Sequence, residues 1–361
     1  MKAGLFLCLL LAPALLAGQD AEAGRETVLD GIVRLEDSLY TAVPALPRLC
    51  DETRSEKRQV DIGDCSLFVE IEGEGVPLVL INGGPGGTHH YFHPWFSRIS
   101  ASHKIIYYDQ RGTGLSDFQP GSGYTFRQAA DDLEKLRIQL GIGKWFVCGF
   151  SYGGGVAQLY AAAYPESVLG LVLISSVPLF ESDRFADAQE TYLSAAEKAR
   201  KNEVIREYLA GAFGMDAFLF NLALNGDWKR QNFYRPSREE MIRSALYEWV
   251  NDADFNSVVS SDLARYRFRG LFDRCPLPTL IFEGANDLTW GAEKAFAFKE
   301  NHPSAQFIRF ERAAHGVYND VPDAFYPALE AFTRSAPAVS AGSVREWKQL
   351  IEGKISPAGD E

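Results

Sequence analysis

The feature that most constrains the fold is a serine between glycines, where an apolar run meets an Ala-rich run. The motif reads Gly-Phe-Ser-Tyr-Gly at residues 149–153. The apolar run Lys144–Cys148 before it predicts a buried strand, and Gly154–Tyr164 after it predicts a helix that ends before Pro165. Such a tight strand-to-helix turn is typical of a nucleophilic serine presented at the end of a parallel sheet. The sequence therefore predicts Ser151 as a catalytic nucleophile.

The rest of the chain repeats this alternation of strand and helix patterns. Further buried strands are predicted at Val76–Ile81, Lys104–Tyr108, Val168–Ile174, Pro278–Glu283 and Gln306–Phe310, with helices at Phe126–Leu140 and Ala324–Thr333. Arg58–Ile62 and Ser66–Ile71 alternate like the arms of a hairpin. Alternating elements of this kind predict an α/β fold with a mostly parallel central sheet flanked by helices.

A block of helical patterns interrupts the alternation and predicts an inserted helical cap. The expected organisation is an N-terminal extension at 24–58, core parts at 59–177 and 275–335, the cap at 178–274, and a peripheral C-terminal tail at 336–361.

The first 23 residues have the pattern of a secretory signal peptide. Lys2 precedes an uncharged run, Leu5–Ala17, which is too short to span a bilayer but typical of a signal sequence. Small residues in Ala21–Ala23 predict cleavage before Gly24, with an uncleaved anchor as the alternative. We therefore expect an exported protein, periplasmic or secreted.

The charge of the chain excludes some partners. There are 36 basic and 48 acidic residues, a net charge of -12. Nucleic acids and anionic membranes need a basic face, so we expect neither nucleic acid nor, after signal cleavage, membrane as a main partner. The sequence leaves the oligomeric state open.

Export permits disulfides, and four cysteines remain after cleavage. Cys50 and Cys65 are near one another in sequence and precede the main sheet, so they are the favoured disulfide pair, although sequence cannot fix the connectivity. Cys148 lies in an apolar run and is expected to be a buried small hydrophobic residue.

A serine nucleophile needs a general base and an acid that orients the base. In α/β folds with a nucleophilic serine at such a strand-to-helix turn, the three residues occur along the chain in the order serine, acid, histidine. Only His302 and His315 follow the cap. His302 precedes Pro303 and is expected in an exposed turn. His315 follows the last strand and is the predicted general base, and Asp287, after the preceding strand, is the predicted acid.

Two backbone N–H groups should form the oxyanion hole. One belongs to Tyr152, the residue after the serine, and the other to the loop after the third strand. That loop reads Asn-Gly-Gly-Pro-Gly-Gly at 82–87, and its glycines let the backbone approach a ligand closely.

Three motifs together carry a family resemblance. The loop at 82–87, the segment Asp-Gln-Arg-Gly-Thr-Gly-Leu-Ser at 109–116 and the serine motif resemble the prolyl aminopeptidase (proline iminopeptidase) family of α/β-hydrolases, over roughly residues 60–335. The resemblance implies Gly84 as the second oxyanion donor and a structural role for Asp109 and Arg111. The family's loop begins with histidine where this chain has Asn82.

The resemblance also implies how a peptide would be held. Family members use cap carboxylates to grip the free amine of the substrate. Glu248 beside Trp249 resembles their Trp-Glu pairing in reversed order, although a solvated carboxylate on a helix face is the alternative. Some relatives carry Glu after the catalytic Asp, where this chain has Leu288.

Nothing in the sequence requires a cofactor. His89, His90 and His93 cluster after the oxyanion loop, but no carboxylate or cysteine partner is evident, so no metal site is predicted and we expect them to line the substrate entrance. Neither a P-loop nor a dinucleotide motif is present.

Three hypotheses for function follow from the residues and the resemblance. The first is a secreted serine hydrolase of the prolyl aminopeptidase type that releases N-terminal residues from short peptides. The second is a carboxylesterase or lactonase acting on a small apolar ester through the same triad. The third is a non-catalytic binding protein on a hydrolase scaffold.

Overall fold

The computed structural model describes residues 39–43, 53–120, 123–179, 195–225, 234, 254–263, 265–266, 270–287 and 297–351. The predicted signal peptide at 1–23, Cys50, the Glu248–Trp249 pair and Leu288 lie outside these ranges.

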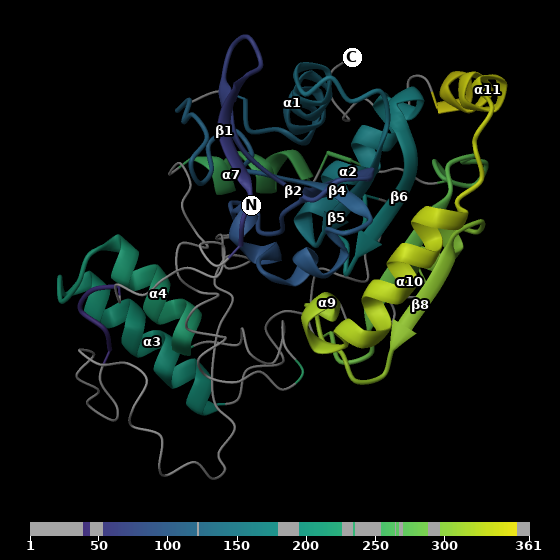
Figure 1. Ribbon diagram of the computed structural model, residues 1–361. Coiled ribbons are helices and arrows are strands. Elements are labelled where there is room, and N and C mark those ends of the chain that lie inside the picture. The colour runs from purple at the N-terminus through teal and green to yellow at the C-terminus, as the bar shows by residue number, and fades with distance from the viewer. Residues whose placement is uncertain are drawn as a thin grey trace.

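The centre of the molecule is an eight-stranded sheet (Figure 1). Its strands are β1 (Glu56–Asp61), β2 (Ser66–Glu72), β3 (Val76–Ile81), β4 (His103–Tyr108), β5 (Trp145–Phe150), β6 (Val168–Ile174), β7 (Thr279–Gly284) and β8 (Gln306–Phe310). They lie in the order β1-β2-β4-β3-β5-β6-β7-β8. The pairs β1–β2 and β2–β4 are antiparallel, and every other pair is parallel. The mostly parallel sheet predicted from the apolar runs is confirmed.

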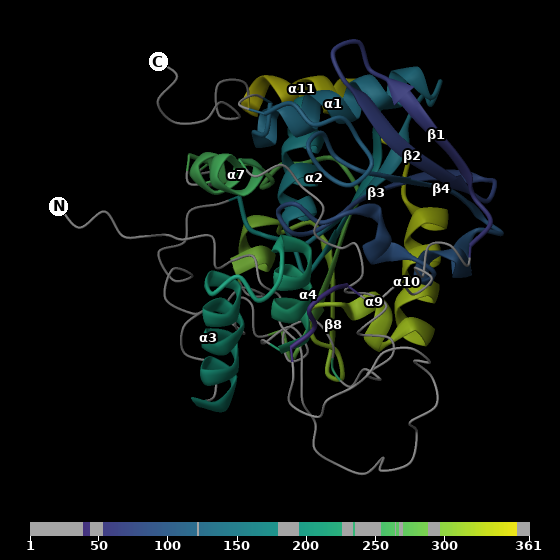
Figure 2. The same cartoon turned by 90° about the vertical axis from the view of Figure 1, so that its left-hand side faces the viewer.

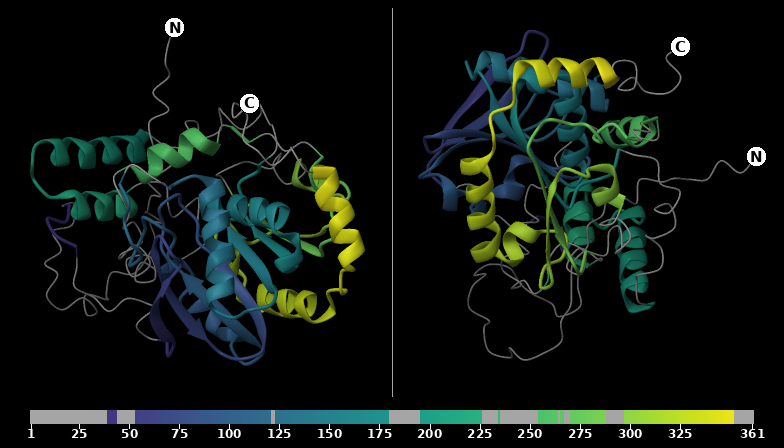
Figure 3. Two further views of the ribbon diagram at one scale, coloured as in Figure 1. Left: turned by 90° about the horizontal axis from the view of Figure 1, so that it is seen from above. Right: turned by 90° about the vertical axis from the view of Figure 1, so that its right-hand side faces the viewer.

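Helices cover both faces of this sheet. One face carries α1 (Phe126–Gln139), α2 (Tyr152–Ala163), α7 (Phe255–Leu263) and α11 (Ala341–Ile351). The other carries the 3₁₀ turns η3 (His89–Phe92) and η4 (Trp95–Ile99) with helices α9 (Val317–Asp320) and α10 (Pro322–Ser335). A third 3₁₀ turn, η5 (Pro165–Ser167), leads into β6. Figure 3 shows the sheet between the two layers.

The central strands form because consecutive apolar side chains point to opposite faces of the sheet and are buried on both. In β3, Val79 and Ile81 belong to the hydrophobic cluster under α1 and α2, whereas Leu78 and Leu80 belong to the cluster under α10. A run without polar residues is therefore what a strand covered on both sides requires. Helix α1 begins at Thr125, whose hydroxyl accepts the Gln128 N–H at 3.1 Å.

The helices α3 (Ala195–Leu209) and α4 (Met215–Asn225) pack on one another within the predicted cap range. They share a small apolar cluster. Figure 1 shows them to one side of the sheet, and Figure 2 shows them below α7 and α2. The Asn221 side chain bonds both the N–H and the carbonyl of Tyr40, at 2.8 and 2.7 Å. Part of the N-terminal extension therefore lies against this helix pair. No helix within the described ranges has the length and apolar character needed to cross a membrane.

The C-terminal segment is not merely peripheral. Helix α11 lies in the range predicted as a tail, and its Trp347 is 2% exposed. The indole N–H donates to the Leu271 carbonyl at 3.0 Å. The amphipathic spacing of Val344, Trp347 and Ile351 attaches the helix to the core.

Two further sequence expectations were wrong. Cys65 is a free thiol buried in the β1–β2 hairpin, which contradicts the expected pairing with Cys50. His302 is buried rather than exposed, because its ring stacks on Phe272 at 4.2 Å and on Phe298 at 5.7 Å. The burial of Cys148, in contrast, is confirmed.

Candidate active site

The backbone at Ser151 has the left-handed conformation that side chains rarely adopt. Its φ is 52° and its ψ is -118°, and α2 begins at the next residue. Three hydrogen bonds hold it there: the Ser151 N–H donates to Ile174, and its carbonyl accepts from Gly154 and Val177, at 2.9 to 3.0 Å. Strain of this kind persists only where the surroundings fix it, and it clusters at functional sites.

Three glycines around the serine leave no space for a methyl group. A Cβ on Gly153 would lie 2.1 Å from the Ile81 carbonyl oxygen, and one on Gly154 would lie 2.1 Å from Ser176 Oγ. A Cβ on Gly149 would lie 2.3 Å from the carbonyl oxygen of Gly153. The start of α2 therefore packs directly against β3 and the segment that follows β6, which is why the motif needs glycine on both sides of the serine.

The structure brings together the two residues predicted as base and acid. His315 Nδ1 lies 2.8 Å from Asp287 Oδ2, and both side chains are buried. Asp287 follows β7 and His315 follows β8, so both lie beyond the carboxyl ends of adjacent parallel strands. The ring of His315 lies 4.9 Å from that of Phe150, the residue before Ser151. The three predicted residues therefore share one end of the sheet.

Two residues that the sequence reasoning missed support the histidine loop. Ser175, at the end of β6, has a positive φ of 44° and donates its hydroxyl to the His315 carbonyl at 2.7 Å. Asp320 accepts the Ala314 N–H at 2.7 Å through one oxygen and the Tyr234 N–H at 2.8 Å through the other. Burial raises the pKa of Asp320 to about 6, against the opposing effect of these two N–H groups. The signal available in the sequence was an acidic residue five positions after the predicted base.

The glycine loop at 82–87 passes close to the serine. A Cβ on Gly83 would lie 3.2 Å from Ser151 Cβ, and Gly84 has a φ of +127°. The buried side-chain amide of Asn82 donates to the carbonyls of Gly83 and Gly87 and so closes the loop on itself. Asn82 therefore holds this loop through its side-chain amide.

The predicted scaffold loop at 109–116 makes scaffolding contacts. Buried Asp109 accepts the His89 N–H at 2.8 Å and the Leu115 N–H at 2.9 Å. Arg111 makes a two-pronged ion pair with Asp132 in α1, at 2.7 and 2.8 Å. The loop is thereby tied to η3 on one side and to α1 on the other.

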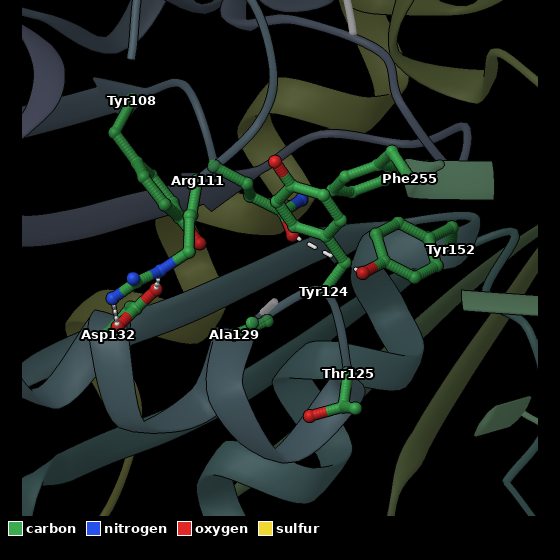
Figure 4. Close-up of a pocket in the computed structure, with 10 residues that line it drawn as sticks. Tyr108, Arg111, Tyr124, Thr125, Ala129, Asp132, Tyr152 and Phe255 are labelled. Carbon is green, nitrogen blue, oxygen red and sulfur yellow. Dashed lines mark hydrogen bonds and ion pairs between the residues drawn. The ribbon is translucent and has the colours of Figure 1, made fainter. Parts of the chain in front are cut away.

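A small pocket lies behind the serine turn (Figure 4). Its lining consists of Tyr108, Gln110, Arg111, Gly123, Tyr124, Thr125, Ala129, Asp132, Tyr152 and Phe255. The Tyr152 side chain points into it and its hydroxyl donates to Gln110 at 3.4 Å. Neither Ser151 nor His315 is part of this lining, so the pocket is distinct from the candidate reaction centre.

His89, in η3, and His93, directly after it, are not at a substrate entrance. His89 is 1% exposed and His93 is 0% exposed, and Glu70 on β2 lies beside both. The sequence reasoning found no acidic partner because Glu70 comes from another strand, nearly twenty residues earlier. The expectation that these histidines line the entrance was therefore wrong.

Comparison with known proteins agrees with this architecture. Residues 76–321 match the family model described as the alpha/beta hydrolase fold. The proline iminopeptidase of Saccharolobus solfataricus is 38% identical over 290 residues, which cover 76% of this chain and 90% of that protein. The proline iminopeptidase of Neisseria meningitidis serogroup A is 28% identical over 290 residues, covering 71% and 88%.

Among solved structures, an esterase from Exiguobacterium antarcticum superposes with a TM-score of 0.60 at 21% identity, covering 78% of this chain and all of that one. This likeness supports the fold. The family match over more than half of the chain shows that the protein is a hydrolase of the α/β-hydrolase fold family, and the sequence identity to the proline iminopeptidases shows that it resembles them.

Proposed function

We propose that the protein is a serine hydrolase in which Ser151 is the nucleophile, His315 the general base and Asp287 the orienting acid. The observation that carries this proposal is the strained left-handed backbone of Ser151 at a strand-to-helix junction. The hydrogen bond from His315 Nδ1 to Asp287 supports it, since that bond leaves Nε2 to act on the serine.

In the proposed reaction, His315 removes the Ser151 hydroxyl proton as Oγ bonds to the substrate carbonyl carbon. Asp287 keeps the proton on Nδ1 and stabilises the imidazolium that forms. The imidazolium then protonates the leaving group as its bond to the carbonyl carbon breaks. A water molecule attacks the acyl-enzyme with His315 as base, which releases the acid and restores Ser151.

The proposed oxyanion donors are the N–H groups of Gly84 and Tyr152. The N–H groups in the first turn of a helix have no carbonyl acceptor within it, and they carry the positive end of the helix dipole. Tyr152 is the first residue of α2, and the loop at 82–87 lies against Ser151. Two such donors preorganised near the serine would stabilise the developing negative charge.

We propose short peptides with a free N-terminus, with proline first, as substrates. The identity to the Saccharolobus solfataricus proline iminopeptidase supports this choice. A cationic amine needs a carboxylate partner, and Glu248 beside Trp249 is the proposed candidate in the cap. No cofactor is part of this mechanism.

A paired rate assay on the purified protein tests the proposal. The substrates are a proline p-nitroanilide, its N-acetylated counterpart and p-nitrophenyl acetate, with Ser151→Ala as the blank. We expect anilide hydrolysis to fall about ten-thousand-fold or more in Ser151→Ala, and to be lost on acetylation of the substrate.

Each other outcome contradicts a different part of the proposal. Fast ester cleavage without anilide turnover would replace the peptidase by a carboxylesterase or lactonase, with Asn82 and Leu288 as the first positions to change. Failure of wild-type Ser151 to react with a fluorophosphonate would leave a binding protein on a hydrolase scaffold.

We also propose that residues 1–23 direct export to the periplasm or the medium. The short apolar run Leu5–Ala17 and the small residues at Ala21 and Ala23 support this.

A further inference from the structure

A cluster of buried metal-ligating side chains lies beside the candidate active site and takes no part in the proposed reaction. Glu70 comes from β2, His89 opens η3, and His93 follows η3 directly. All three side chains are at most 1% exposed. One ligand atom from each lies within 4.8 Å of those of the other two.

The spacing of these atoms fits a shared cation. His89 Nε2 lies 3.2 Å from Glu70 Oε1, and His93 Nε2 lies 3.3 Å from Glu70 Oε2. Ligands bound to Zn²⁺ at about 2.0–2.1 Å with tetrahedral angles lie roughly 3.3 Å from one another. Each histidine nitrogen is thus as far from its nearest Glu70 oxygen as two ligands of one tetrahedral ion are from each other, and all three ligand atoms lie within 4.8 Å of one another.

The Nδ1 atom of each of the two imidazoles already has a hydrogen-bonding partner. His89 Nδ1 lies 2.8 Å from the Asp109 carboxylate, and His93 Nδ1 lies 3.1 Å from the Thr53 hydroxyl. Histidines that bind metal usually donate their second N–H to a carboxylate or another oxygen, which fixes the ring and its tautomer. Here both Nε2 atoms are left facing Glu70.

His93 Nε2 adds an independent observation. The atom is buried, and although it lies near Glu70 it makes no hydrogen bond of acceptable geometry. A buried ring nitrogen without a hydrogen bond costs free energy unless another species, such as a bound ion, interacts with it.

The charges around the cluster point to a cation as that species. The carboxylates of Glu70 and Asp109 are both buried. The partly exposed Lys57 ammonium lies 3.2 Å from Glu70, and the Ser55 hydroxyl donates to Glu70 at 2.8 Å. Lys57 offsets one of the two negative charges, so the cluster keeps a net negative charge that favours a bound cation.

We propose that Glu70, His89 and His93 bind a divalent transition-metal ion of the Zn²⁺ class at a structural site. Two imidazole nitrogens and one carboxylate oxygen are a donor set that suits zinc. Such an ion would fix η3, which follows the oxyanion loop, to β2. The competing occupant is a proton, carried by His89 between Asp109 and Glu70.

The test measures metal binding, so it is independent of whether the proposed hydrolysis is correct. The full-length purified protein is stripped with a chelator and titrated with Zn²⁺ against a chromogenic competitor. We expect one equivalent bound with a Kd below about 1 μM, and a melting temperature about 4 °C higher at 100 times Kd. Co²⁺ in place of Zn²⁺ should give the intense visible absorption of a four-coordinate site.

Glu70→Gln and His93→Gln should each weaken Zn²⁺ binding about 100-fold or more. His302→Gln, a change at a buried histidine elsewhere in the fold, is the matched control and should bind as the wild type does. Wild-type protein that takes up no Zn²⁺ at micromolar concentration would overturn the site and leave the bridging proton. Uptake that survives both cluster substitutions would also overturn it. If the variants do not fold, the Co²⁺ spectrum of the wild type decides.

Discussion

At the scale of single residues, the candidate site depends on groups that touch no reacting atom. Asp320 holds the backbone of Ala314, the residue before His315, and the backbone of Tyr234 within the predicted cap. An ionised carboxylate accepts a hydrogen bond from each N–H group, one on each oxygen. A protonated carboxyl group keeps only one oxygen that is a good acceptor. The charge of Asp320 therefore sets how firmly the histidine loop is joined to the cap range.

Asp320→Asn should lower kcat/KM about tenfold at pH 8, because one of the two N–H groups loses a charged acceptor. The pKa of the native carboxyl is raised to about 6, so this advantage of the wild type exists above pH 6 and is lost below it. The ratio of wild-type to variant kcat/KM, measured from pH 5 to 8, should rise with pH through 6. A ratio that stays constant with pH would contradict this role.

At the scale of elements, periodicity predicted most of the sheet. The bounds expected for β3, β6 and β8 are those observed, because continuous apolar runs between turn residues leave little choice of position. The buried α11 was missed because only three of its side chains contact the core, within a segment rich in small and charged residues. The Glu70 cluster was missed because its members come from different elements, and no local pattern reports such a contact.

Helix α11 should contribute measurably to stability. Trp347→Ala removes a buried indole and its hydrogen bond to Leu271, which should cost about 3 to 5 kcal/mol of unfolding free energy in urea titrations. Leu350→Ala on the same helix is the control: that side chain is 49% exposed, so less than about 1 kcal/mol is expected. Equal losses in the two variants would mean that the helix, not the indole contact, carries the effect.

At the scale of the whole molecule, the proposed export would place the free cysteine thiols in an oxidising compartment, where exposed thiols can be oxidised. Burial raises the pKa of Cys65 to about 11 and that of Cys275 to about 12, so reactive thiolate is scarce at neutral pH. Cys148 is fully buried. A fold that shields these thiols tolerates an oxidising compartment without needing a disulfide between them.

The mature protein, isolated from the periplasm or the medium, should begin at Gly24 when its N-terminus is sequenced. Cys65 and Cys148 should resist alkylation in the native protein and react after unfolding, because the reagent needs an accessible thiolate. An intact N-terminus on a protein retained in the membrane fraction would instead show an uncleaved anchor.

The packing of glycines around Ser151 has an evolutionary consequence. Three positions that perform no chemistry have no room for even one added carbon atom, so substitutions there should be selected against although the glycines touch no substrate. New substrate preferences in such a lineage must therefore arise elsewhere, in the segments that surround the turn. A fold of this kind can change what it acts on many times while the few residues at its centre stay the same.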